Sequence, residues 1–386
     1  MDEADLDRRS VGHQASLPIA LTRWRFAMPA AVADPNAVTS QARLERCYSG
    51  KECTWDLFYK PRWERANFAT RYHLVYPALA YYIRIRKDPS LAPHLRPQLD
   101  TMFRGLLDQR TWTYWHTELN EPGWPLAERN LTYAGRLATF VGFYIDAYGV
   151  PPPPAIELEG RTTSYSELSQ TLWRQMQASP TGGVTCYRHE SMTQCNAHLL
   201  INNLLHDRLF GTRYAEANIG WLTTLRERLL TQQADGPLFF FGTQSASCEP
   251  AKHRVSLGID IWTLFLMSAV VPEQVANWFA RWEQNIAHAN GRASIEIPSA
   301  ENDAESSSTP LATAWAFCLA RELGREDLAQ NLRWTLDEGI ERGFELDPLL
   351  SGLYLLGTSL EPGAFRRLVQ ESPAPVRKPA LAHRCN

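Results

Sequence analysis

Residues 182–221 read GGVTCYRHESMTQCNAHLLINNLLHDRLFGTRYAEANIGW. The two leading glycines permit a tight backbone turn. The residues that follow Cys195 have the apolar periodicity of an amphipathic helix, which we expect over 193–209. A glycine then interrupts the pattern, and a second helix is expected over 213–232. The stretch therefore predicts two consecutive helices, preceded by a loop that carries two thiols.

The same helical pattern recurs along most of the chain, while strand signals are few. Twelve helices joined by alternately short and long loops predict an all-α fold, an (α/α)6 barrel, which is a toroid of helical hairpins. The expected helices are 64–86, 93–109, 127–148, 164–178, 193–209, 213–232, 257–270, 273–290, 309–323, 325–335, 346–357 and 361–370.

No flexible Gly/Ser linker divides the 386 residues, so we expect one barrel domain over 21–371. Residues 1–20 and the Pro-rich tail 372–386 lack periodicity and are expected to be disordered. The acidic, polar start shows no signal peptide, which predicts a cytoplasmic protein.

Charge and hydropathy exclude several classes of partner. The formal net charge is -3 and no run of Lys/Arg follows a predicted helix, so nucleic acid is not expected as a partner. The longest apolar stretch, 262–271, is shorter than the roughly 20 residues that cross a bilayer, so no membrane span is expected. The seven cysteines are too sparse for a disulfide framework, and free thiols are the default.

Two cysteines stand out because Cys186 and Cys195 are nine positions apart and flank a single loop. Cys195 opens the predicted helix 193–209, where the positive end of the helix dipole favours a thiolate. This predicts an acid/base or nucleophilic thiol. Three other interpretations stay open: the two thiols are small buried hydrophobes, they form a disulfide, or they bind zinc together with His189 and His198.

Other candidates lie on neighbouring elements. Arg136 and Tyr133 are three residues apart on one predicted helix, so they share a face, and an arginine there could bind a carboxylate or polarise an oxygen. Asp260 interrupts an apolar stretch and either pairs with another group or acts as an acid or base. Trp115 belongs to an aromatic loop that lines a pocket or packs in the core.

Several motifs are absent from the sequence. It contains no DDxxD or DxDD cluster, no P-loop, no GxGxxG and no GxSxG. Magnesium-diphosphate, nucleotide and serine-hydrolase chemistry therefore lose support.

The stretch from Cys186 to Trp221 resembles the linalool dehydratase/isomerase family. The shared features are two cysteines at this spacing, Asn196 after the second, and the segment D-R-L-x-G-T-x-Y at Asp207–Tyr214. Weaker agreement extends over roughly residues 40–340. The resemblance implies an (α/α)6 barrel, an apolar pocket without cofactor or metal, and a homo-oligomer whose neighbour contributes to the site.

Carried over residue by residue, the resemblance implies four catalytic residues, Cys186, Cys195, Tyr48 and Tyr72. Arg136 stands where the family has a catalytic histidine, and we expect it to join them. The residues expected to bind substrate are Tyr133, Thr132, Trp262, Gly258, Asp260, Tyr187 and Trp115.

These departures change the expected substrate. Thr132 and Gly258 replace a larger methionine and tyrosine of the family, so the pocket should accept a bulkier molecule. Arg136 adds a permanent cation suited to a carboxylate or carbonyl. We therefore expect a cofactor-independent lyase or isomerase acting on a hydrophobic, oxygenated terpenoid in natural-product metabolism. A cofactor-free cyclase of the pericyclase type and a non-catalytic terpenoid-binding protein are the alternatives.

Overall fold

The computed structural model describes residues 34–55, 66–117, 119–126, 129–149, 155–186, 190–231, 237–244, 250–254, 256–297, 308–343 and 347–372. Residues from Pro35 onward form one compact unit, which is described here by itself. The ends predicted to be disordered, 1–20 and 372–386, lie outside the described residues apart from Ser372.

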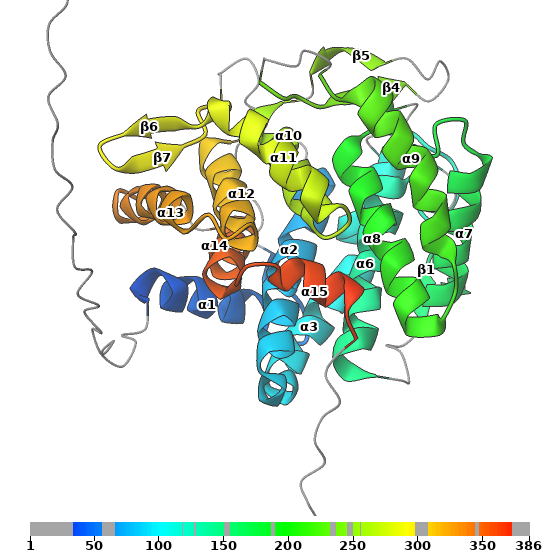
Figure 1. Ribbon diagram of the computed structural model, residues 1–386. Coiled ribbons are helices and arrows are strands. Elements are labelled where there is room, and N and C mark those ends of the chain that lie inside the picture. The colour runs from blue at the N-terminus through cyan, green and yellow to red at the C-terminus, as the bar shows by residue number, and fades with distance from the viewer. Residues whose placement is uncertain are drawn as a thin grey trace, which may run out of the picture. The chain divides into compact units, whose positions relative to one another are not determined.

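Among the described residues, six helices form a closed inner ring. Each packs against the next in sequence order, and the last packs against the first. Their residues are buried almost throughout, as expected for helices surrounded by other helices (Figure 1). The inner helices are α2 (Ala66–Lys87), α6 (Leu131–Tyr148), α8 (Thr193–Phe210), α10 (Leu257–Ser268), α12 (Thr309–Glu322) and α14 (Pro348–Ser359).

A second set of helices packs on the outside of this ring and buries only one face. α3 contacts α2 and α6, α7 contacts α6 and α8, α9 contacts α8, α11 contacts α10, α13 contacts α12, and α1 contacts α14. The alternation of inner and outer helices confirms the predicted (α/α)6 barrel. The outer helices are α1 (Pro35–Tyr48), α3 (Ala92–Leu107), α7 (Tyr165–Ala178), α9 (Asn218–Thr224), α11 (Pro272–Trp282) and α13 (Glu326–Glu341). After α14, α15 (Ala364–Gln370) contacts the inner helices α2 and α8.

Short elements connect the helices. Two short helices, α4 (Gln109–Trp112) and α5 (Tyr114–Thr117), precede α6. The described strands form three antiparallel sheets: β1 (Ile156–Leu158) with β2 (Arg161–Thr163), β3 (Glu190–Ser191) with β4 (Phe241–Gln244) and β5 (Pro250–Arg254), and β6 (Ala287–Ala289) with β7 (Arg292–Ser294). Because β3 immediately precedes α8, the middle sheet lies beside the loop that carries the two thiols.

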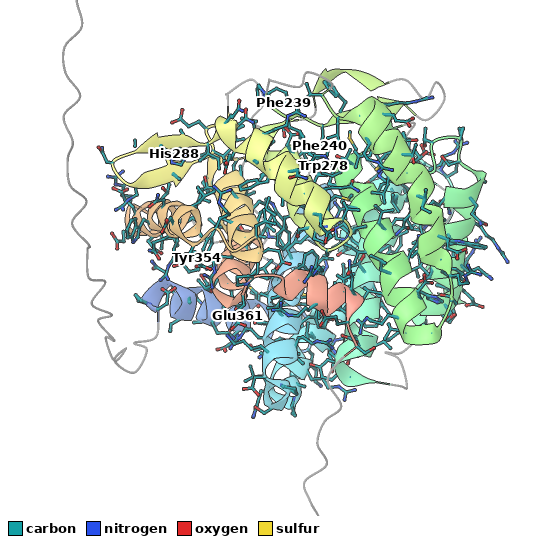
Figure 2. The ribbon with its side chains drawn as sticks, in the orientation of Figure 1. Phe239, Phe240, Trp278, His288, Tyr354 and Glu361 are labelled. Carbon is teal, nitrogen blue, oxygen red and sulfur yellow. The ribbon has the colours of Figure 1, made fainter. Side chains whose placement is uncertain are left out.

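Residues just before β4 join the middle sheet to the helices. The rings of Phe240 and Trp278 meet edge to face, with centroids 6.2 Å apart (Figure 2). The amide of Phe240 donates to Asp260 Oδ1 at 3.1 Å. These contacts fix the start of β4 against α10 and α11.

All twelve predicted helices are present, although several of their ends differ and one outer helix, α1, was not predicted. The helix predicted over 273–290 ends at Trp282, and β6 follows it. The helix predicted over 213–232 is a short 3₁₀ turn, then α9, then a π-helical turn over Leu225–Leu229. α1 was not predicted, because its sequence PNAVTSQARLERCY has few apolar residues to mark a helical face. None of the described helices has the length and apolar character that crossing a membrane requires.

The ring closes through a close approach of α14 to α2. A Cβ atom added at Gly352 would lie 2.7 Å from the Cα atom of Pro77 and 2.9 Å from its nitrogen. Only a residue without a side chain fits at this distance from a backbone. Gly352 therefore sets the spacing of the two helices that close the barrel.

We predict that Gly352→Ala destabilises the protein by about 1–3 kcal/mol, because α14 must move away from α2. Gly220→Ala, within α9, is the matched control. Its added Cβ would meet only the Cα atom of Gly182, at 3.4 Å. Urea unfolding of both variants measures the difference. Equal midpoints for the two variants would contradict this account of ring closure.

Candidate active site

The loop before α8 is held against the barrel by two glycines. Gly182 has a φ of +69°, and a Cβ on Gly183 would lie 2.3 Å from the Trp221 ring. The side chain of Asn196 then fastens the loop to the start of α8: its Oδ1 accepts from the amide of Val184 at 2.8 Å, and its Nδ2 donates to the carbonyl of Val184 at 3.1 Å. The predicted turn and helix start thus place the loop at one fixed position.

This loop brings the two predicted thiols together in the interior. Cys195 lies in the first turn of α8 and Cys186 lies in the loop, and both are buried. The amide of Met192 donates to Cys186 Sγ at 3.0 Å. The Cys186 thiol donates to the carbonyl of Met192 at 3.9 Å and interacts with Cys195. Both are free cysteines rather than a disulfide.

Arg136 of α6 faces Cys195 from the neighbouring inner helix. Its Nη1 donates to the carbonyl and the hydroxyl oxygens of Thr132, at 2.7 and 3.2 Å, and lies 3.7 Å from Cys195 Sγ. The side chain is fully buried. In the described part of the chain no carboxylate pairs with it, so the sulfur of Cys195 is the group that can neutralise its charge.

The environment separates the pKa values of the two thiols. Burial by itself raises the pKa of Cys195, but the hydrogen bond from Cys186 and the positive charge of Arg136 outweigh it and lower the pKa below the ordinary 9.0. Burial and the same hydrogen bond raise the pKa of Cys186 well above its ordinary value. Burial would lower the pKa of Arg136, yet Tyr76 and Cys195 raise it, so the guanidinium stays charged. The site therefore favours a Cys195 thiolate, a Cys186 thiol and an Arg136 cation.

Aromatic rings surround the guanidinium. Its carbon lies 4.8 Å from the ring centroid of Tyr72 and 5.2 Å from that of Trp262. Trp262 stacks on Trp315 at 5.6 Å and meets the edge of Tyr72 at 5.2 Å. Arg71 donates to the hydroxyls of both Tyr72 and Thr132, at 3.0 Å each. Thr132 therefore accepts from both arginines, and Tyr72 and Trp262 form the apolar wall of the site.

Two further polar residues lie at the site: Tyr76, which was not named from the sequence, and His198, which was named only in the zinc interpretation. The hydroxyl of Tyr76 lies near Arg136 and forms a hydrogen bond of 2.9 Å with His198 Nε2. His198 Nδ1 lies 3.3 Å from the hydroxyl of Thr139. Burial and the charge of Arg136 hold the pKa of His198 well below its ordinary value, so its ring is neutral. In the sequence, the signal for His198 was its position three residues after Cys195, on the same face of α8.

The other predicted residues lie as follows. The hydroxyl of Tyr48, at the end of α1, donates to the main-chain carbonyl of His73. The hydroxyl of Tyr133 donates to the carbonyl of Leu106 on α3 at 2.6 Å, whereas Arg136, three residues later, reaches Cys195. Two predicted neighbours on one helix face thus have different partners.

Asp260 and Gly258 are both buried in the first turn of α10, two residues apart. Trp115 is buried on α5. Tyr187 lies outside the described residues, as does His189, which the zinc interpretation requires. Within the described residues, no group of His, Cys, Asp or Glu is arranged to hold a metal ion.

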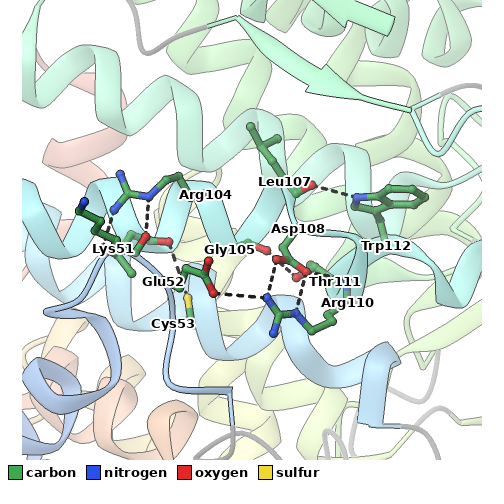
Figure 3. Close-up of polar contacts among 11 residues, drawn as sticks. Lys51, Glu52, Cys53, Arg104, Gly105, Leu107, Asp108, Arg110, Thr111 and Trp112 are labelled. Atoms are coloured by element: carbon green, nitrogen blue, oxygen red, sulfur yellow. Dashed lines mark hydrogen bonds and ion pairs between the residues drawn. The ribbon is translucent and has the colours of Figure 1, made fainter. Parts of the chain in front are cut away.

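The loop after α1, which contains Cys53, is fastened to α3 by polar contacts (Figure 3). The thiol of Cys53 donates to the carbonyl of Thr101 at 3.6 Å, and Arg104 Nε donates to the carbonyl of Lys51 at 2.9 Å. Burial raises the pKa of Cys53 to about 12. These contacts are those of a packed, protonated thiol, unlike the environment of Cys195.

The barrel and its paired thiols define a helical-barrel protein with a buried, charged thiol site. The family model described as linalool dehydratase/isomerase matches residues 71–346, which include Cys186, Cys195 and Arg136. This chain belongs to the linalool dehydratase/isomerase family.

Solved structures share the fold. The Lin0763 protein from Listeria innocua is 15% identical with a TM-score of 0.50, and the match covers 84% of this chain and 95% of that one. The GH76 alpha-mannanase BT2949 of Bacteroides thetaiotaomicron is 12% identical with a TM-score of 0.50, covering 87% of this chain and 96% of that one. At such identities the likeness is one of fold, and it carries no information on substrate.

We predict that one cysteine, Cys195, remains a thiolate at pH values well below the ordinary thiol pKa of 9.0. Because the pKa of Cys195 is lowered, its thiolate signal is lost only as the pH falls through that lowered value. Carbon-13 NMR of protein labelled at the cysteine Cβ atoms follows this titration. Arg136→Met removes the cation and should raise the pKa, so that the thiolate disappears at a higher pH.

Cys195→Ala should remove the signal altogether. Cys318→Ala is the matched control, because Cys318 is also buried on an inner helix and burial raises its pKa. A titration in which every cysteine stays protonated until the pH reaches the ordinary range of thiol pKa values would refute the assignment.

Proposed function

We propose that this protein is a cofactor-independent lyase or isomerase that acts on a hydrophobic, oxygenated terpenoid. The observation that carries the proposal is the buried pair of Cys186 and Cys195, with Cys195 Sγ 3.7 Å from the Nη1 atom of Arg136. Two like groups whose environments push their pKa values apart supply a base and an acid to one reaction. A reaction that shifts a double bond or removes water needs both.

The proposal assigns each residue a role. Cys195 accepts a proton from the substrate, and Cys186 delivers one. Tyr72 and Trp262 pack against the hydrocarbon part of the substrate. Tyr48 and Tyr133 donate their hydroxyl protons to main-chain carbonyls, so no proton transfer is assigned to them.

The substrate class has two sources of support. The rings of Tyr72 and Trp262 lie against Arg136, and Trp315 stacks on Trp262, which suits a hydrocarbon skeleton. Linalool, after which the family is named, is a terpene alcohol. Arg136 adds a hydrogen-bond donor for a substrate oxygen. A plain hydrocarbon would leave this donor unused.

A second candidate function is a cofactor-free cyclase of the pericyclase type. It is favoured by the Nε and Nη2 atoms of Arg136, which are buried and form no hydrogen bond of normal geometry with the described residues. Such donors could polarise a substrate carbonyl, and orientation would then supply most of the acceleration. This mechanism does not need the thiols.

Reaction in heavy water separates the two functions. A panel of terpenoid alcohols and ketones is incubated with the protein, and the products are analysed by mass spectrometry. We expect isomerised products that carry solvent deuterium, or dehydrated products, in which no new C–H bond forms. Cys186→Ala and Cys195→Ala should each slow turnover by about 10²–10⁴-fold, the usual contribution of a positioned acid or base. Cys318→Ala, the matched buried thiol, should retain full activity.

Two outcomes would contradict the proposal. An isomeric product free of deuterium, formed at the same rate by both cysteine variants, would establish the cyclase instead. Tight binding of terpenoids without turnover of any of them would indicate a binding protein.

A further inference from the structure

The sign of the charge in the site restricts the intermediate that it can stabilise. Arg136 is fully buried, and its guanidinium carbon lies 4.8 Å from the Tyr72 centroid and 5.2 Å from the Trp262 centroid. Aromatic faces stabilise cationic carbon when they are free to receive it. Here a permanent cation already lies against both rings.

Proton transfer to Cys195 neutralises the sulfur that pairs with Arg136. The guanidinium is then left without an anionic partner unless a negative charge develops on the substrate. For two unit charges about 5 Å apart at an effective dielectric constant of about 20, their attraction speeds such a step by a factor on the order of a hundred. The site thus favours negative charge on substrate oxygen once Cys195 has taken a proton.

The unused donors of Arg136 point to the same conclusion. Nη1 is committed to Thr132 and Cys195, while Nε and Nη2 are buried without a hydrogen bond of normal geometry among the described residues. Buried donors are ordinarily satisfied in a working complex. A carbonyl oxygen accepts two such bonds and becomes a better acceptor as it turns into an enolate.

We propose that the substrate is a terpenoid ketone or aldehyde and that the reaction passes through an enolate whose oxygen is held by Nε and Nη2 of Arg136. The proposal rests on the proposed function, because it uses the same two thiols. It adds the substrate class and the charge of the intermediate.

The step balances without a redox partner. The Cys195 thiolate takes a proton from a carbon next to the carbonyl, or conjugated with it, and the electron pair of the broken C–H bond moves to the carbonyl oxygen. Cys186 then gives its proton to the far end of the conjugated system, and the pair returns from oxygen to carbon, which shifts the double bond. If a β-hydroxyl is present, the enolate expels it, and it leaves as water with the Cys186 proton. After either outcome Cys195 holds a proton and Cys186 is a thiolate, so the proton passes from Cys195 to Cys186 and the starting state is restored.

The test compares two probes that differ only at the oxygen, the terpenoid enone β-ionone and its alcohol β-ionol. Isothermal titration calorimetry with the wild-type chain should show the ketone bound about 10- to 100-fold more tightly, the usual range for a hydrogen bond to a charged group. The ultraviolet band of the bound enone should shift to longer wavelength, because Arg136 withdraws charge towards the carbonyl oxygen.

Arg136→Met should abolish both the preference for the ketone and the band shift, with little change in the affinity for β-ionol. Arg136→Lys keeps the charge and should retain part of the preference. Because the wild-type comparison needs no variant, a misfolded Arg136→Met protein would not spoil the test. Equal binding of the two probes, or tighter binding of the alcohol, with an unshifted band, would overturn the enolate route.

This failure is distinct from a failure of the proposed function. Without a ketone preference, deuterium uptake and the loss of activity in the cysteine variants would still stand. A ketone preference with isomerised products that carry no deuterium would instead refute proton transfer by the thiols, and with it the enolate route.

Discussion

The buried guanidinium of Arg136 is the constraint on which the site depends. A charge in the interior is costly unless a partner of opposite charge lies close to it. In the described part of the chain no carboxylate meets this need, and Cys195 Sγ lies 3.7 Å from Nη1. The arginine therefore favours the thiolate, and the thiolate in turn favours a protonated Cys186. From one fixed cation follow a base, an acid and a preference for negative charge on substrate oxygen.

The barrel supplies the rigidity that this arrangement needs. Arg136 and Cys195 lie on adjacent inner helices of a closed ring, and Asn196 holds the Cys186 loop to the start of α8. The charge pair also links stability to pH. The pKa of Cys195 is lower in the folded protein than in the unfolded chain, because Cys186 and Arg136 outweigh the effect of burial. The pair therefore stabilises the fold at pH values above the unfolded pKa of the thiol. That contribution is lost as the pH falls through the folded value.

Much of the fold was predictable, because helical periodicity is a local property of the sequence. All twelve expected helices are present, and Cys195 does lie in the first turn of α8. The contact between Arg136 and Cys195 was not predictable in this way, since the two residues are 59 positions apart. The hydroxyl of Tyr133 also turns to α3 although Tyr133 and Arg136 are neighbours on one helix face. Pairings of this kind are set by tertiary packing rather than by local pattern.

The central claim is that Cys195 and Arg136 form a buried ion pair, and a double-mutant cycle tests it most directly. The free energy of unfolding is measured at neutral pH for the wild type, Cys195→Ala, Arg136→Met and the double variant. If the pair is charged, Cys195→Ala strands the buried guanidinium, whereas Arg136→Met leaves Cys195 as a neutral thiol and the double variant holds no stranded charge, which gives a coupling energy of about 1–3 kcal/mol. Effects that add to within about 0.5 kcal/mol would contradict the ion pair and the chemistry built on it.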